Sequence, residues 1–356
     1  MSTEIKKILI TSGRSPAGLE LARVLNQCGH EVYSIDSLKY ALCGFSNAIK
    51  KQYQVPPPRQ STQEYINEII KIIKKHKIDL IIPSYEETFY ISLNKEKLKK
   101  HCDVFVDEIK KLKNLHNKYD FIQLCKEIDL PTPETKIVST QTKAIHEISK
   151  NQNTIMKPVY SRYGEEVIIN PNEEKIKKTN ISEKNKWVVQ EKLTGKQLSS
   201  YSIAKNGKLY AHSIYPIDIT IDKVSINFKP ITNSAVTNWV KKFIKETNYT
   251  GQISFDFFET ENNEIYAIEC NPRITSGIHL FRDNKHFVDA IINQSNSEVI
   301  EPQKKTNSMI AFMVMIYGFN KLKNIKKNLL TFVQSKDIIF SLKDPLPLIG
   351  QIISFS

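Results

Sequence analysis

The sequence has few cysteines, and their spacing fits neither a metal site nor a disulfide framework. The five cysteines lie at positions 28, 43, 102, 125 and 270, with no Cys-x-x-Cys pair and no Cys/His cluster. An odd, scattered set argues against a zinc site and against a small disulfide-linked fold. We expect reduced thiols that are mostly buried.

Long apolar runs are also missing. No segment approaches the roughly 20 apolar residues that a membrane-spanning helix needs. The first residues, Met1–Lys7, lead into a short apolar run without a cleavage site, which is unlike a secretory leader. The longest apolar candidate, Met309–Phe319, is better explained as a buried strand. The sequence therefore predicts a cytoplasmic protein with no membrane partner.

Arginine is scarce: the chain has six arginines against 45 lysines, although its formal net charge is +13. The lysines are spread along expected helices as pairs. Nucleic-acid readers usually cluster their charge and favour arginine, whose planar guanidinium matches phosphates and base edges. The pattern predicts lysine-rich solvated faces and no nucleic-acid partner. A basic nucleic-acid binder remains an alternative on net charge alone.

The N-terminal part alternates apolar segments with helical spacing. Lys7–Thr11 and His30–Asp36 are expected strands, separated by the turn Ser12–Gly18 and a helix over Leu19–Cys28. This order of strand, turn and helix predicts an α/β fold with a doubly wound parallel sheet. The turn lacks the Gly-x-Gly-x-x-Gly pattern, so a dinucleotide site is only weakly supported.

Another expected strand, Ile78–Pro83, follows a predicted helix over Thr62–Lys77 and ends in a polar segment. Ligands of open α/β sheets bind beyond the carboxyl ends of the strands. Candidate substrate residues are therefore Ser84, Glu86 and Glu87. A polar helix start, in which the acids favour the helix dipole, is an equally good alternative.

Two later segments have the alternation of half-buried strands. In Ile253–Phe257 the apolar residues occupy one face and Asp256 the other. In Tyr266–Asn271 the face opposite the apolar Ile268 and Cys270 carries Ala267, Glu269 and Asn271. The residues from 259 to 264 form a hairpin-length connection. Pairing the strands would place Asp256 and Glu269 on a common face, with Asn271 one pleat further along.

Two carboxylates and an amide oxygen on one sheet face suit a hard divalent cation. Magnesium takes oxygen ligands and usually binds through one or two carboxylates plus substrate phosphates. Ala267 is small and would leave room on this face. Arg273, just past the strand, could hold a phosphate or an acyl phosphate. Spacing alone is equally consistent with a solvated sheet face whose acids point outward.

The segment Ile-Glu-Cys-Asn-Pro-Arg at 268–273, preceded by Phe-Asp-Phe at 255–257, closely resembles the metal strands of the ATP-grasp superfamily. The resemblance is to the carboxylate–amine or carboxylate–thiol ligase type, with a carbamoyl-phosphate-synthase-like ATP-binding fold. In that family these side chains hold two Mg²⁺ ions, with Mn²⁺ as an alternative, against the phosphates of ATP. The resemblance implies metal roles for Asp256, Glu269 and Asn271, and a catalytic role toward phosphate or substrate for Arg273.

Two lysines resemble those that contact the nucleotide phosphates in this family. Lys157, in the segment 154–158, matches the family's strand lysine, a flexible point charge suited to phosphate. Lys118, near the start of a helix expected over Lys113–Ile128, resembles an earlier lysine of the same kind. A solvated helix lysine is the alternative for Lys118.

The segment Val188–Gln197 resembles the hinge between the two lobes that enclose ATP. The resemblance implies adenine contacts around three residues, namely Gln190, Glu191 and Leu193. At the position of residue 197, members of this family usually have an acid that binds the ribose hydroxyls. Gln197 can still donate and accept hydrogen bonds there but carries no charge.

Several polar residues are further candidates for substrate contacts. Arg162 lies in a loop with one glycine, where the family has a glycine-rich loop over the phosphates. His212 and Tyr215 lie on a predicted strand of the same lobe, and Ser276 and His279 follow the metal strand. For His279, a surface or core-edge histidine is the alternative.

The resemblance implies an α/β fold followed by an α+β fold. A Rossmann-like parallel-sheet domain would span 1–105, a two-lobed ATP-grasp domain with an antiparallel sheet 106–295, and a small C-terminal extension 296–356. The hinge would lie near 190–194. The implied activity is an ATP- and Mg²⁺-dependent ligase that activates a carboxylate as an acyl phosphate for an amine, giving ADP and phosphate.

Small-molecule carboxylate and amine substrates are the partners that this activity implies, with a homodimer left open. Two alternatives remain. One is carboxylation through carboxyphosphate, and the other is a nucleotide-binding regulatory protein without turnover, which the uncharged Gln197 and the glycine-poor loop favour.

Overall fold

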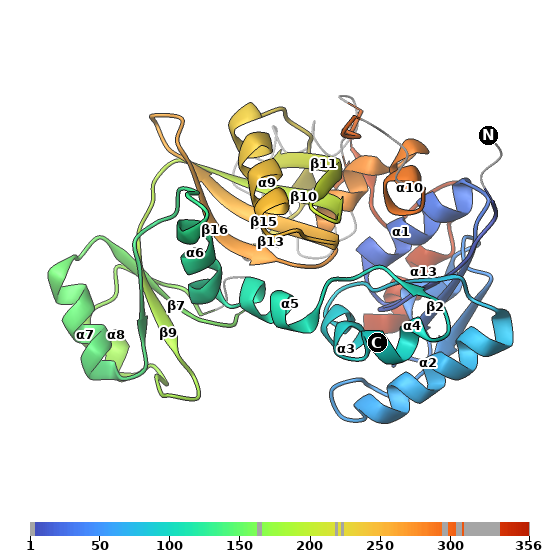
Figure 1. The fold of residues 1–356 in the computed structure, drawn as a ribbon, viewed down its shortest axis with the longest axis horizontal. Coiled ribbons are helices and arrows are strands. Elements are labelled where there is room, and N and C mark those ends of the chain that lie inside the picture. The colour runs from blue at the N-terminus through green and yellow to red at the C-terminus, as the bar shows by residue number, and fades with distance from the viewer. Residues whose placement is uncertain are drawn as a thin grey trace.

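The computed structural model describes residues 4–161, 166–217, 220–221, 224–293, 298–303, 308–309 and 335–355. Figure 1 shows an N-terminal α/β part at one end of the molecule, a central antiparallel sheet, and a small lobe at the other end. Within the described ranges, no helix combines the length and the apolar character needed to cross a bilayer. The buried strand expected over Met309–Phe319 lies outside the described residues, apart from Met309.

The N-terminal part is built on a parallel sheet of five strands. In sheet order these are β3 (Lys51–Gln54), β2 (Glu31–Asp36), β1 (Lys7–Ile10), β4 (Leu80–Ile82) and β5 (Asp103–Val104). Ile8 and Ile10 pack with helix α1 (Pro16–Gln27), whereas Leu9 packs with α2 (Thr62–His76). Because the two helices cover opposite faces, the sheet is doubly wound, and the predicted α/β class is confirmed.

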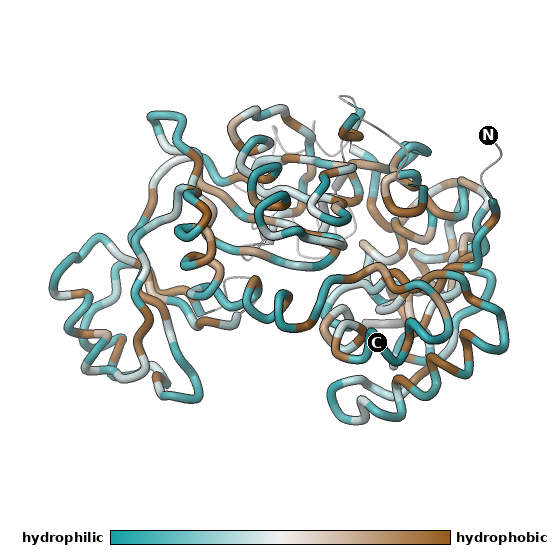
Figure 2. The backbone as a smooth tube through the Cα atoms, viewed as in Figure 1, coloured by the Kyte–Doolittle hydropathy of each residue, from teal (hydrophilic) through white to brown (hydrophobic). Residues whose placement is uncertain are grey.

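The loops and helices after β2 and β4 complete this part. They are η1 (Leu42–Phe45), α3 (Glu87–Leu93) and α4 (Lys95–Lys99). The lysines of α2 are exposed, and Figure 2 shows hydrophilic residues alternating with apolar ones along this helix. The helix predicted over Thr62–Lys77 is confirmed and ends one residue earlier, because Lys77 adopts a left-handed conformation.

The single helix expected over Lys113–Ile128 is wrong, because the structure contains two helices there. They are α5 (Ile109–His116) and α6 (Lys118–Glu127). Asn117 lies between them in an extended conformation, and its side chain accepts hydrogen bonds from the amides of Tyr119 and Asp120. A helix cap of this kind favours a new start over continuation.

The small lobe is an antiparallel sheet covered by two helices. Its strands, in sheet order, are β6 (Thr135–Val138), β9 (Trp187–Glu191), β7 (Thr154–Pro158) and β8 (Ile168–Ile169). Helices α7 (Gln141–Lys150) and α8 (Glu173–Lys177) close a core that includes Met156, Ile176 and Trp187.

The central sheet is antiparallel and has long strands. In order these are β11 (Lys208–Pro216), β10 (Lys196–Lys205), β15 (Gly251–Glu259) and β16 (Ile265–Asn271). Helix α9 (Ser234–Glu246) covers one face, where Trp239 and Phe243 stack on each other and both meet the Phe255 ring edge-on. Tyr201 on the other face contacts Phe281 of η2 (Ser276–Phe281) and Phe287 of α10 (His286–Ile291). The predicted α+β part is therefore confirmed.

The remaining short elements lie beside the central sheet and the N-terminal part. They are β12 (Thr220–Ile221), β13 (Val224–Ser225), β14 (Asn227–Phe228), β17 (Ser308–Met309), β18 (Lys336–Asp337) and α13 (Pro347–Phe355). Helix α13 packs against η1 of the N-terminal part, where a side chain on Gly350 would meet the Phe45 ring. The described C-terminal segment therefore packs against the N-terminal part.

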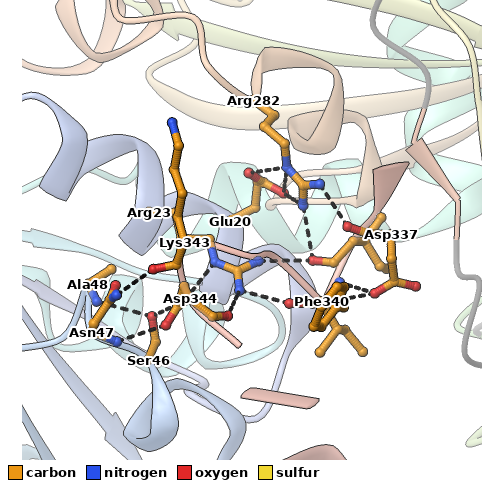
Figure 3. Close-up of polar contacts among 12 residues, drawn as sticks. Glu20, Arg23, Ser46, Asn47, Ala48, Arg282, Asp337, Phe340, Lys343 and Asp344 are labelled. Carbon is orange, nitrogen blue, oxygen red and sulfur yellow. Dashed lines mark hydrogen bonds and ion pairs between the residues drawn. The ribbon is translucent and has the colours of Figure 1, made fainter. Parts of the chain in front are cut away.

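A buried polar network holds this segment in place (Figure 3). Arg23 of α1 donates to the carboxylate of Asp344 at 2.9 Å and to the carbonyl of Ile339 at 2.7 Å. Arg282, after η2, donates to the carboxylate of Glu20 on α1 and to the carbonyl of Asp337. Three regions far apart in sequence therefore meet at α1.

Candidate active site

Two carboxylates lie directly opposite each other on the central sheet. Strands β15 and β16 pair Asp256 with Glu269 and Ser254 with Asn271, as the predicted hairpin requires. The hydroxyl of Ser199, from β10, donates to the Asp256 carboxylate at 2.8 Å. The predicted common face for Asp256 and Glu269 is confirmed, and Ser199 is a residue of this face that the motif comparison missed.

A β-bulge interrupts the register next to Glu269. Asp256 pairs with Glu269, but Phe257 pairs with Ala267, so Ile268 is the extra residue of β16. Ala267 is consequently buried in the same core as Cys270. The expectation that Ala267 shares the face of Glu269 is wrong, because the bulge reverses the alternation at that point.

Two buried lysines approach the carboxylates. Lys118 and Lys157 are 2% and 3% exposed, and the only other buried lysine among the described residues is Lys95. The Lys118 ammonium lies 3.5 Å from the Glu269 carboxylate and donates to the carbonyl of Ser161. Lys157 donates to the carbonyl of Ile268, at the bulge, at 3.1 Å. Lys118 is therefore not a solvated helix lysine.

The electrostatics of this cluster are set by burial and by like charges. Burial and the facing Glu269 carboxylate raise the pKa of Asp256 to about 6. Burial alone would raise the pKa of Glu269, but Lys118 and Lys157 outweigh it and lower that pKa. Burial and the neighbouring Lys118 lower the pKa of Lys157 to about 8. The cluster therefore holds two facing acids beside two cations, with little water to screen them.

The donor set suits a cation that arrives with other oxygen ligands. Among the described residues, no group of three or more His, Cys, Asp and Glu side chains is arranged to hold a metal. Asp256 and Glu269 supply two carboxylates, and the amide oxygen of Asn271 lies two residues along β16. Two carboxylates completed by phosphate and water oxygens match the ligand preference of Mg²⁺. A cation between the acids would also relieve their repulsion.

Arg273 joins this strand to the N-terminal part. Its guanidinium Nη2 donates to the amide oxygen of Asn271 at 3.2 Å, and its Nε lies 3.2 Å from Glu86. The guanidinium also lies 5.2 Å from the centre of the Tyr85 ring. The structure therefore brings together Glu86, a candidate from the first parallel sheet, and Arg273 beside the carboxylates.

The predicted hinge is the passage between the two antiparallel sheets. Strand β9 belongs to the small lobe and β10 to the central sheet, so the chain crosses at 192–195. Gly195 has a φ of 142°, and a Cβ there would lie 2.1 Å from the carbonyl oxygen of Glu259. Only glycine fits this crossing without displacing the backbone.

The residues predicted to bind the nucleotide at the hinge lie in different environments. The Gln190 side chain is buried and donates to the Thr135 hydroxyl at 2.8 Å. Glu191 ends β9, and its carboxylate accepts from the amide of Glu134 at 3.3 Å. Leu193 lies in the crossing, and Gln197 is exposed on β10. Adenine and ribose contacts for these four residues stay predictions.

Two candidate histidines lie outside the carboxylate cluster. His212 lies on the α9 face of the central sheet, bonded to the Ser202 hydroxyl at 2.9 Å, and burial lowers its pKa to about 3. His279 is buried beside Glu20 at 3.0 Å, on η2. Both histidines are therefore packed inside the protein, and a substrate contact for either one stays a prediction.

The structure places the other candidate residues in different surroundings. Tyr215 lies beside Ser199 near Asp256, and burial raises its pKa to about 12. Ser84 is buried at the end of β4, bonded through its backbone to Thr11. Ser276 begins η2. Arg162 lies outside the described residues.

Comparisons with known proteins agree with this geometry. Residues 115–277 match the sequence family described as the ATP-grasp domain. This range contains the two lysines, the hinge and both strands of the carboxylate cluster. A comparison with curated protein sequences gives no match.

Solved structures of similar fold cover most of the chain. N5-carboxyaminoimidazole synthetase from Staphylococcus aureus is 16% identical, with a TM-score of 0.65 over 83% of this chain and 80% of that one. The synthase from Aspergillus clavatus, in complex with ADP and 5-aminoimidazole ribonucleotide, is 11% identical, with a TM-score of 0.65 over 84% and 80%. The biotin carboxylase domain of 2-oxoglutarate carboxylase from Hydrogenobacter thermophilus, in complex with MgADP, ADP and bicarbonate, is 16% identical, with a TM-score of 0.61 over 77% and 65%.

Proposed function

We propose that this chain, whose residues 115–277 match the ATP-grasp domain, is an ATP- and Mg²⁺-dependent ligase of the ATP-grasp superfamily. It would activate a carboxylate as an acyl phosphate for attack by an amine, releasing ADP and phosphate. The observation that carries the proposal is the facing pair Asp256 and Glu269, flanked by the buried Lys118 and Lys157. Opposed acids beside buried cations are suited to a polyanion that brings its own divalent metal.

The residues of the cluster have distinct tasks in this reaction. Lys118 and Lys157 bind phosphate oxygens as point charges, and lobe closure at the hinge excludes water. Asp256, Glu269 and Asn271 would hold Mg²⁺, which when bound neutralises phosphate charge and orients the transferred group. Arg273 lies at the end of the same strand, where it can bind the carboxylate or the acyl phosphate.

The activation step explains why no protein nucleophile is required. A free carboxylate is a poor acylating agent, because its leaving group is oxide. Transfer of the γ-phosphoryl group to a carboxylate oxygen replaces that leaving group with phosphate. An amine then attacks the carbonyl carbon, the C–N bond forms, and phosphate leaves with the bonding pair. The protein contributes position and charge.

We further propose two Mg²⁺ ions, with Mn²⁺ as a substitute, adenine contacts around Gln190, Glu191 and Leu193, and a ribose contact from Gln197. The chain would divide into 1–105, 106–295 and 296–356. It would act in the cytoplasm, as a homodimer or a monomer. The substrates would be small molecules.

Carboxylation through carboxyphosphate is the second candidate. It is favoured by the similarity in fold to N5-carboxyaminoimidazole synthetases and to a biotin carboxylase domain. Bicarbonate would then take the place of the carboxylate substrate at the same site.

One assay separates these functions. The protein is incubated with Mg²⁺, ATP and hydroxylamine, together with pools of carboxylic acids or with bicarbonate alone. Acid-dependent ADP release with formation of a hydroxamate supports the ligase. ADP release with bicarbonate alone supports carboxylation. Tight ATP binding without ADP release in any pool would contradict both and leave a non-turnover binder.

A further inference from the structure

Arg273 lies between anionic groups of two parts of the molecule. Toward the N-terminal part, its Nε lies 3.2 Å from the Glu86 carboxylate. Toward the central sheet, its Nη2 donates to the amide oxygen of Asn271 at 3.2 Å. Glu269 precedes Asn271 by two residues in a regular stretch of β16, so both side chains lie on one face. About 7 Å of strand separates them, a distance that a long arginine side chain can span.

The buried position of this guanidinium makes its counterion important. The Arg273 side chain is 9% exposed and that of Glu86 is 16% exposed. A buried cation that loses its counterion is unfavourable, so it moves to the next carboxylate within reach. Asp256 and Glu269, opposite each other on adjacent strands, are such carboxylates. The charge of Glu86 therefore decides whether Arg273 stays off the acids that the proposed Mg²⁺ needs.

The turn after β4 contacts the guanidinium with two consecutive residues. The central carbon of the Arg273 guanidinium lies 5.2 Å from the centre of the Tyr85 ring, within the range of a cation–π interaction. Tyr85 has a φ of 57°, a left-handed conformation that is unusual for a bulky residue. Such conformations persist where the surrounding structure requires them. The turn thus presents the Tyr85 ring and the Glu86 carboxylate to the same side chain.

The contact with Glu86 leaves one donor of Arg273 without an aligned acceptor. Within the described part of the chain, the buried Nε donates no hydrogen bond, whereas Nη1 donates to the carbonyl of Ile274 at 3.4 Å. Buried donors of native proteins are nearly always satisfied. Glu86 therefore attracts the guanidinium by charge, while one N–H group stays available for an anion that binds beside Arg273.

We propose that Glu86 is a positioning residue, which holds Arg273 away from the metal carboxylates so that Mg²⁺ and the guanidinium occupy separate places. The inference rests on the proposed function, because it concerns the metal site and the anion that Arg273 would bind. When position 86 is uncharged, Arg273 pairs with Glu269 or Asp256, and Mg²⁺ has to displace it. The N-terminal part thereby influences the metal affinity of a site that is built from other strands.

The test measures how much Mg²⁺ is needed for ATP binding. Calorimetry gives the affinity for ATP at a series of Mg²⁺ concentrations, for the wild type and for Glu86→Gln, which keeps the shape of the side chain. The matched control is Glu108→Gln, which also removes an ion pair, that with Lys95. Both substitutions are then repeated in an Arg273→Met background, where the competing cation is absent.

We expect the Mg²⁺ concentration that gives half of the maximal ATP affinity to rise at least about fivefold in Glu86→Gln. It should stay at the wild-type value in Glu108→Gln. In the Arg273→Met background, Glu86→Gln should have no effect, because no guanidinium is left to compete with Mg²⁺. An unchanged Mg²⁺ requirement in Glu86→Gln would overturn the inference. An equal rise with and without Arg273 would overturn it too, since Glu86 would then act through the fold alone.

Two further outcomes separate this inference from the stability of the variant and from the proposed function. Loss of ATP binding in Glu86→Gln supports the inference if Arg273→Met restores binding, and overturns it if binding stays lost. A wild type that binds ATP with Mg²⁺ but releases no ADP with any acid or with bicarbonate would contradict the ligase function and leave this inference standing. A wild type without Mg²⁺-dependent ATP binding would overturn both.

Discussion

At the scale of single residues, Lys157 is the most unusual side chain of the candidate site. It is buried, it donates to the Ile268 carbonyl, and its neighbours are Lys118, Glu269 and Asp256. Burial and the neighbouring Lys118 disfavour the charged form of Lys157, and the carboxylates of Glu269 and Asp256 offset this only in part. The local charges therefore favour a phosphate ligand more strongly than the sequence alone does.

Replacing Lys157 by methionine should weaken ATP binding while keeping the apolar stem of the side chain. A hydrogen bond to a charged group contributes about 1.5–3 kcal/mol, so we expect Kd for MgATP to rise roughly 10- to 150-fold. Isothermal calorimetry measures the change. The exposed Lys184→Met, in the same lobe, should bind MgATP as the wild type does. Equal affinity of Lys157→Met and wild type would remove this lysine from the site.

The same cluster predicts a pH window for MgATP binding. The pKa of Asp256 is raised to about 6, so protons compete with Mg²⁺ as the pH falls below that value. The pKa of Lys157 is lowered to about 8, so its charge is lost as the pH rises above that value. We expect the highest affinity between these values, and Lys157→Arg should remove the decrease on the alkaline side. A pH-independent Kd would contradict this assignment.

The sequence allowed the site residues to be predicted where alternation is local. The spacing of two adjacent strands predicted the shared face of Asp256 and Glu269, and the family resemblance implied the metal roles of these residues and of Asn271. The bulge at Ile268 was not predictable, because a single inserted residue leaves no clear signal in a short strand. The ion pair of Glu86 with Arg273 joins residues 187 positions apart, and no periodicity indicates such a contact.

At the scale of elements, the crossing from β9 to β10 sets how the two antiparallel sheets meet. The chain leaves the small lobe at Glu191 and enters the central sheet at Lys196, close to the β15–β16 hairpin. Four residues make this passage, and Gly195 passes against the backbone of Glu259. The geometry of the hinge therefore depends on one glycine.

Gly195→Ala should destabilise the protein and disturb the hinge. Both the left-handed φ and the overlap with the Glu259 carbonyl oppose a Cβ, and we expect a loss of at least about 2 kcal/mol in the free energy of unfolding. Gly29→Ala is the matched control, because its φ is also positive but nothing lies within 4 Å of the added Cβ. Urea unfolding measures both. If the two variants lose the same stability, the close approach at Gly195 has no effect.

Element prediction succeeded where hydrophobic spacing was long and regular. Helix α2 and the strands β1, β2 and β4 of the parallel sheet were predicted with small errors at their ends, whereas β3 and β5 were not predicted. The helix expected over Lys113–Ile128 failed, because the apolar spacing continues through Asn117 while its side chain caps a new helix. Local capping thus overrode a pattern that extends across both helices.

At the scale of the whole molecule, the buried network of Figure 3 links helix α1, near the N-terminus, to residues of the C-terminal part of the chain. Glu20 and Arg23 of α1 bind Arg282 and Asp344, which lie more than 250 residues away in sequence. Burial would raise the pKa of Glu20, but Arg282 and His279 lower it to about 2. Glu20 therefore stabilises the fold as a carboxylate.

Glu20→Gln should lower stability and flatten its acid dependence. A shift from 4.5 to about 2 corresponds to a contribution on the order of 3 kcal/mol. Because the folded pKa is depressed, this contribution is fully present above pH 4.5 and is lost as the pH falls toward about 2. Urea unfolding across this range measures it, with the exposed Glu68→Gln as control. Equal acid dependence of Glu20→Gln and wild type would show that the ion pair adds no stability.

The order of the parallel and antiparallel parts was predictable from segment patterns and from family resemblance. The docking of the C-terminal segment on α1 was not, because it depends on side chains 321 positions apart. Ion pairs of this kind have no periodic signature, and the arginines involved are only two of six in the chain.

The central claim is that ATP and Mg²⁺ bind at the strand of Glu269 and Asn271. Calorimetry of ATP binding, with and without Mg²⁺, tests it in the double variant Glu269→Ala with Asn271→Ala. The control is Glu261→Ala with Asn262→Ala, an exposed acid and amide in the adjoining hairpin. We predict Mg²⁺-dependent binding in the wild type and in the control, and its loss in the double variant. Unchanged Mg²⁺-dependent ATP binding in the double variant would contradict the claim.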